Sequence, residues 1–73
     1  MMMYQIILKG QLHPCHERRL APLTLRHLPD GNSCLEGLLA DQAALFGLLL
    51  RLRDIGIPLL SLRAIEVEVE VTQ

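Results

Sequence analysis

The sequence has few of the features that mark several large classes of protein. Tryptophan is absent, aromatic residues are 3% of the 73 residues, and the net charge is −1 with scattered arginines, which argues against a nucleic-acid surface. Two cysteines are too few for a disulfide framework and favour a reducing cytoplasm. No apolar run approaches the roughly 20 residues of a membrane span, and the N-terminus does not resemble a signal peptide. We therefore expect neither nucleic acid nor a membrane as partner.

Apolar residues, by contrast, are abundant for so short a chain. Hydrophobic residues make up 51% of the sequence, and leucine supplies most of them. A chain of this length forms one domain, residues 1–73, and buries only roughly 60% of the surface of its unfolded state. We expect that a solitary domain cannot hide this much leucine and valine, and that a second copy of the chain covers the remainder.

Three segments in the first half of the chain have the pattern of β-strands. Residues 3–12 alternate apolar and polar side chains, as do residues 22–28. The turn sequence "PDGN" at 29–32 separates the second segment from a third at 33–39. This spacing predicts a strand at 3–12 and a β-hairpin formed by 22–28 and 33–39.

Residues 41–55 have the pattern of an α-helix. Asp41 is placed to cap its N-terminus, and Gly56 is the residue at which a helix commonly ends. Gly47 within the helix is unfavourable by about 1 kcal/mol relative to alanine, which predicts the close approach of another backbone, either from the sheet of the same chain or from a second subunit. One face of the helix is apolar and packs on the core. The opposite side is also apolar, so we expect it to contact a partner through Ala43, Phe46 and Leu50.

The last segment, residues 59–71, is predicted to be a long strand. Its apolar residues occupy even positions up to Ala64 and odd positions afterwards, which predicts a bulge near residues 63–65. The strand has an unpaired backbone edge that favours pairing with another strand. We expect its alternating residues to contribute to an interface, namely Ile65, Val67, Val69 and Val71.

The order of the elements indicates an α+β fold. It matches a small ferredoxin-like domain, βαββαβ, in which the first helix is reduced to a short turn around residues 15–20. The alternative is a ββαβ antiparallel sheet covered by one helix.

Residues 35–62 resemble a group of short bacterial proteins of unknown function. The hallmark of this group is a Gly-x-x-x-Asp-Gln-Ala-Ala-Leu-x-Gly-Leu-Leu core followed by Arg-Asp-x-Gly-x-x-Leu-x-Ser. The chain matches it at Gly37, Asp41, Gln42, Ala43, Ala44, Leu45, Gly47, Leu48, Leu49, Arg53, Asp54, Gly56, Leu60 and Ser61. The similarity extends over roughly residues 4 to 63 and implies a fold but no activity. Where relatives carry a tryptophan-bearing segment, this chain reads "CHERR".

The stretch "HPCHERRL" at 13–20 holds the candidates for chemistry. His13, Cys15 and His16 are candidate metal ligands, with His27 and Cys34 as the remaining donors. A structural zinc site needs four ligands in spaced pairs, and this spacing fits poorly. Cys15 and His16 as nucleophile and base lack a nearby oxyanion site. We interpret the stretch as a solvated loop, with no metal and no cofactor.

Three functions agree with these features. The first is a non-catalytic module that self-associates through the outer helix face, the last strand or both, and that serves a second protein encoded nearby. The second is a small-ligand-binding regulatory domain whose site lies at a dimer junction. The third is a small enzyme that depends on a metal or on the Cys15–His16 pair. We favour the first, as a homodimer.

Overall fold

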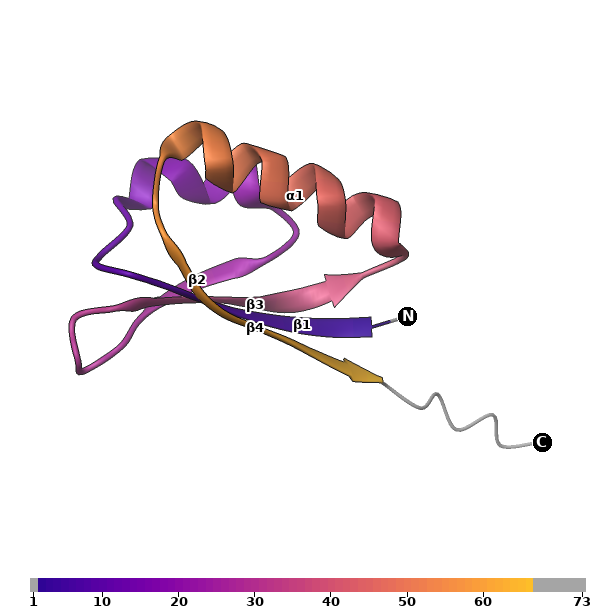
Figure 1. The fold of residues 1–73 in the computed structure, drawn as a ribbon, viewed down its shortest axis with the longest axis horizontal. Helices are drawn as coiled ribbons and strands as arrows, with labels where there is room; N and C mark the ends of the chain where they lie inside the picture. Colours follow the sequence, from indigo (N-terminus) through magenta and orange to yellow (C-terminus); the bar gives the residue numbers. More distant parts are fainter. Residues whose placement is uncertain (1, 67–73) are drawn as a thin grey trace.

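The computed structural model describes residues 2–66, which form one antiparallel sheet with two helices on the same face (Figure 1). Val67, Val69 and Val71, predicted to lie in the last strand, fall outside the described residues. The elements are β1 (Met2–Leu8), η1 (Pro14–Leu20), β2 (Thr24–His27), β3 (Ser33–Leu39), α1 (Gln42–Ile55) and β4 (Leu59–Glu66).

The sheet has the strand order β2-β3-β1-β4, and each neighbouring pair is antiparallel. This arrangement is that of a ferredoxin-like domain, with its two central strands β1 and β3 each linked to an edge strand through a helical crossover. The first crossover helix, η1, is a 3-10 helix of 7 residues. The predicted α+β fold with a degenerate first helix is therefore confirmed.

Two predicted strands are shorter in the structure. β1 ends at Leu8 instead of residue 12, because Gly10 adopts φ +81° and turns the chain out of the sheet. Leu12 nevertheless remains 1% exposed, since the loop after β1 folds back over the core. β2 covers only 24–27 of the predicted 22–28, whereas β3 has the predicted bounds.

Helix α1 begins and ends with caps of the predicted type. The Asp41 side chain accepts a hydrogen bond from the Ala44 amide at 2.8 Å. Gly56 adopts φ +87°, and its amide donates to the carbonyls of Leu52 and Arg53. These contacts satisfy backbone groups that the ends of a helix otherwise leave without partners.

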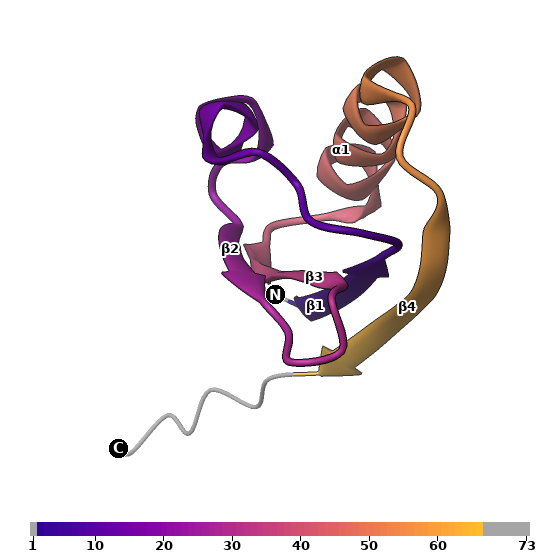
Figure 2. The same ribbon diagram turned by 90° about the vertical axis from the view of Figure 1, so that its left-hand side faces the viewer.

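The hydrophobic core lies between the helices and the sheet face beneath them (Figure 2). Strands β1 and β3 contribute alternate residues to this face, because successive side chains of a strand point to opposite sides. η1 contributes Leu20, and α1 contributes one stripe. The buried core residues of these four elements are Tyr4, Ile6, Leu8, Leu20, Leu35, Leu39, Leu45, Leu48 and Leu52.

The close backbone approach predicted at Gly47 occurs instead at Gly37. A Cβ atom added at Gly47 would meet nothing within 4 Å, so no neighbouring element requires a glycine there. At Gly37 in β3, an added Cβ would lie 3.1 Å from the Leu23 Cα and 3.3 Å from the Pro22 carbonyl oxygen. The segment before β2 crosses over β3 at this point, which the helix pattern alone does not indicate.

Replacing Gly47 with alanine is expected to raise the free energy of unfolding by about 1 kcal/mol, because alanine favours a helix interior and the added methyl group meets open space. Gly56→Ala is the matched control on the same helix. There the left-handed backbone opposes a Cβ, so a loss of about 1 kcal/mol is expected. Urea denaturation measures whether Gly47→Ala raises the free energy of unfolding and whether Gly56→Ala lowers it. A destabilised Gly47→Ala protein would show that a second chain approaches α1 at Gly47.

Candidate functional site

The surface that distinguishes this domain is strand β4, which lies at one edge of the sheet. All 8 of its residues, Leu59–Glu66, are exposed. They include four large apolar side chains, at 48%, 51%, 40% and 45% exposure: Leu59, Leu60, Leu62 and Ile65. Within residues 2–66, β4 pairs on one side only and carries large apolar side chains on both faces. Such a strand presents backbone groups and side chains suited to a further strand.

Burial falls abruptly between β1 and β4 on the face that carries the helices. Ile6 lies opposite Leu62 in the pairing of the two strands, and Tyr4 lies opposite Ala64. Ile6 is 0% exposed, whereas Leu62, one strand further along the same face, is 40% exposed. The apolar face of the sheet thus continues beyond the point where the helices cover it.

The irregularity in β4 lies nearer its start than the predicted bulge. The pairing with β1 is regular from Ser61 to Glu66, and the register shifts between Ser61 and Leu59. The prediction at 63–65 assumed that one face of this strand is buried, so that a change of apolar face needs a bulge. In the structure both faces are exposed, and Ile65 points to the opposite face from Leu62 without any interruption.

The outer side of α1 divides into two regions. Leu50 is two residues from both Leu48 and Leu52, about 160° around the helix from each, so it points away from the sheet.

Arg51 identifies the side of α1 that faces η1, because its guanidinium donates a hydrogen bond to the Arg19 carbonyl at 3.1 Å. Phe46, 59% exposed, lies about 140° around the helix from Arg51. In Figure 2, η1 and β4 lie on opposite sides of α1, so Phe46 is on the β4 side. Ala43 is exposed.

Residues 13–20 consist of His13, which lies directly before η1, and the 3-10 helix η1 itself. The His13 ring accepts a hydrogen bond from the Cys15 amide through Nδ1 at 3.1 Å, so this histidine acts as the N-cap. Cys15 is exposed, and His16 is half-buried. His27 lies against the loop after β1, where its Nε2 donates to the Leu12 carbonyl at 3.1 Å.

The proposed metal donors are not gathered into one site. Within the described residues 2–66, no three His, Cys, Asp or Glu side chains are placed to hold a metal ion. Cys34 is buried beneath the opposite sheet face, where the Arg26 guanidinium donates to its Sγ at 3.9 Å. Cys15, in η1, is on the helix side, so the sheet separates the two thiols.

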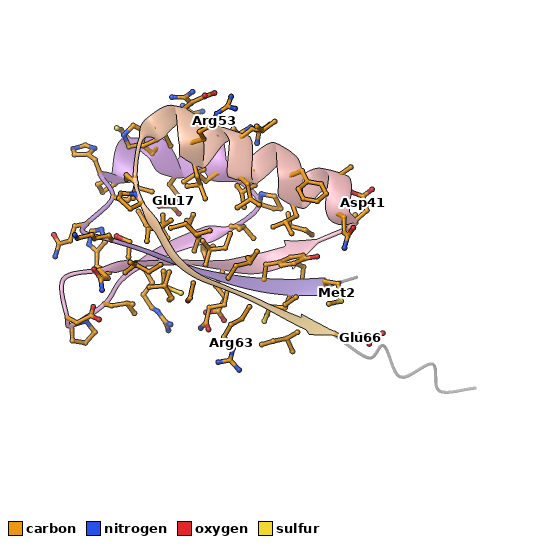
Figure 3. All side chains as sticks on the ribbon, viewed as in Figure 1. Met2, Glu17, Asp41, Arg53, Arg63 and Glu66 are labelled. Carbon is orange, nitrogen blue, oxygen red and sulfur yellow. The ribbon has the colours of Figure 1, made fainter. Side chains whose placement is uncertain are left out.

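Among the described residues 2–66, no helix or loop covers the sheet face away from the helices. An open hollow of about 590 Å³ lies over β2 and β3 there, with Met3 and Leu38 as its apolar lining. Arg26 and Glu36 also line it, and they lie 3.7 Å apart with opposite charges. Figure 3 shows Arg63 of β4 projecting from this same face.

A family model described as a domain of unknown function (DUF8691) matches residues 3–63. The chain belongs to this family. The match confirms that the resemblance is to an uncharacterised family. The DUF8691 range includes η1, β2, β3 and α1 in full, β1 from Met3 onward and β4 as far as Arg63. Comparisons with curated proteins and with solved structures found no match. Within the described part of this DUF8691 chain, neither helix is long and apolar enough to cross a membrane.

Three exposed apolar residues of the candidate surface, Leu59, Leu60 and Leu62, were not among the predicted interface residues. Leu60 and Leu62 have the alternation of a core-facing strand, and the sequence alone does not show that the helices stop short of this edge. The one available signal was the consecutive apolar pair Leu59–Leu60 next to Leu62, which leaves no face of the strand polar at its start. Such a pattern indicates a strand that is covered on both sides.

Proposed function

We propose that the domain is a non-catalytic self-association module and that two copies join edge to edge through β4. The observation that carries the proposal is the exposure of all 8 residues of an edge strand, four of which are large apolar residues. Soluble domains protect such edges with charges, prolines, bulges or short length, because an open edge recruits other strands. β4 has two charged residues among its 8, Arg63 and Glu66, and one register shift near its start.

The opposite edge of the sheet lacks these properties, which favours β4 as the point of contact. β2 has 4 residues, and its exposed side chains are polar or charged, namely Thr24, Arg26 and His27. A short polar edge strand is a common way to prevent pairing. The two edges of the same sheet are therefore protected very differently, and a pairing role for β4 accounts for the difference.

An edge-to-edge contact also explains the composition. Burying a leucine or isoleucine side chain that is about half exposed yields about 1 kcal/mol, and each copy would contribute four such residues from β4. New backbone hydrogen bonds between the paired strands would add about 0.5–1.5 kcal/mol each. These gains offset the loss of translational and rotational freedom on association. The excess of apolar residues in the chain then serves assembly.

A matched pair of substitutions tests the proposal. Leu62→Glu places a carboxylate in the proposed contact and should raise the dimer dissociation constant at least about tenfold, because each charge would be desolvated beside its own copy. Leu50→Glu makes the same chemical change at 50% instead of 40% exposure, on the helix side that points away from the sheet. It should leave the dimer unchanged.

Sedimentation equilibrium over a range of protein concentrations measures both constants, and circular dichroism checks that both variants are folded. Wild-type protein that stays monomeric at every concentration would overturn the proposal. A dimer that is lost in Leu50→Glu and retained in Leu62→Glu would move the contact to the outer helix face, where Ala43 and Phe46 were also predicted to contribute.

A further inference from the structure

The symmetry of a two-copy contact limits how the two β4 strands align. Two identical chains joined by a two-fold axis present the same patch to each other. In an antiparallel pair, directly opposed side chains share a face of the sheet. The axis must therefore pass beside a single residue of β4, and each choice of residue sets every other opposed pair. This step rests on the proposed self-association.

Most choices of axis create an unfavourable pair. An axis at Arg63 would oppose two guanidinium groups, which is destabilising. An axis at Ala64 would oppose Leu62 and the charged Glu66. An axis at Ser61 would oppose Leu62 to Leu60, which lies in the register shift between Ser61 and Leu59 and takes no part in the regular pairing. An axis at Ile65 would oppose Ala64 to the charged Glu66, and an axis at Glu66 would oppose two carboxylates.

We infer that the axis passes beside Leu62. This alignment opposes Leu62 to itself, so an apolar pair lies at the centre of the junction on the helix side of the sheet. On the other face it opposes Arg63 to Ser61, a small neutral residue that brings no like charge. Residues 61–63 of each copy then pair outside the register shift between Ser61 and Leu59, and Arg63 keeps its position on the face away from the helices (Figure 3).

The burial of side chains on the helix side of the sheet supports this junction. Ile6 is 0% exposed, whereas Leu62, which lies opposite it in β4, is 40% exposed. Phe46 is 59% exposed and lies on the side of α1 that faces β4. The second copy would cover the apolar surface that begins beyond Ile6.

Single-cysteine crosslinking tests which residue of β4 lies beside the two-fold axis. In a Cys15→Ser background, Leu62→Cys should form an intermolecular disulfide under mild oxidation, because the two thiols would face each other. Ala64→Cys should form essentially none, because that residue would lie four positions from its copy, about 13 Å along the strand and beyond the reach of a disulfide. Crosslinking at Ala64 and not at Leu62 would overturn the inferred alignment.

A second test does not depend on Leu62. Ser61→Glu should tighten the dimer about fivefold, because two Glu–Arg63 pairs would form across the junction at about 0.5 kcal/mol each. Ser61→Gln is the uncharged control and should leave the dimer dissociation constant unchanged. No tightening, in a protein that still dimerises and still loses its dimer in Leu62→Glu, would overturn the alignment and preserve the proposed function. A monomeric wild-type protein would overturn both.

Discussion

Replacing Gly37 with valine is expected to lower the free energy of unfolding by about 3 kcal/mol. A Cβ at this position would lie 2.6 Å from Leu23 Cδ2 and 3.1 Å from the Leu23 Cα, and valine adds two further methyl groups. Leu23 is only 2% exposed, so its side chain has no empty space into which it can move. The backbone that leads into β2 must therefore shift, and the packing of Leu23 on the core is lost.

The expected sign is opposite to that of strand propensity, which favours valine over glycine. Urea denaturation at one fixed protein concentration measures the difference, since self-association makes stability depend on concentration. Leu38→Val is the control at the next position of β3, where the side chain is 41% exposed, and should change stability by no more than about 0.5 kcal/mol. A Gly37→Val protein as stable as the wild type would mean that residues 22–23 do not cross over β3.

Local patterns in the sequence were sufficient for the helix and the hairpin. Asp41 and Gly56 act through short-range contacts with α1 itself, so their roles can be recognised from neighbouring residues. The turn before β3 is likewise local: the Asp30 carboxylate accepts from the Asn32 amide at 3.0 Å, and Gly31 adopts φ +90°. Elements of this kind are predictable because their determinants lie within a few residues.

The features that were missed depend on contacts between distant segments. The requirement for glycine at position 37 comes from Pro22 and Leu23, which no periodicity relates to β3. The exposure of Leu62 depends on how far the helices extend over the sheet, and the strand pattern is the same whether that face is covered or bare. The candidate surface could therefore be assigned to the last strand from its sequence, but not to the residues at its start.

The exposure of β4 is related to the short first crossover helix, η1. With η1 only 7 residues long, Arg51 of α1 contacts the backbone of η1, and the two helices cover the β2, β3 and β1 side of the sheet (Figure 2). The strand on the far side of β1 is left without a covering layer. Ferredoxin-like order with one short helix thus produces an uncovered apolar edge in a single copy, which the proposed second copy would cover.

Ser33→Ala is expected to destabilise the domain by about 2–3 kcal/mol, because one hydroxyl group satisfies two backbone groups of the loop after β1. The Ser33 Oγ accepts from the Leu12 amide at 2.8 Å and donates to the Gly10 carbonyl at 2.7 Å. Ser33 is 0% exposed, and Leu12 is 1% exposed. A buried amide that loses its only partner costs about 1–3 kcal/mol, and the carbonyl adds to the loss.

Hydrogen exchange at the Leu12 amide gives a readout specific to this contact. The amide should be protected in the wild type and exchange much faster in Ser33→Ala, since only the loop contact, and not a strand pairing, protects it. Thr24→Val is the control, because it removes an exposed hydroxyl that donates to the Glu36 carbonyl at 3.1 Å, and it should change stability by about 0.5 kcal/mol or less. Unchanged protection of Leu12 in Ser33→Ala would show that the loop after β1 does not depend on this hydroxyl.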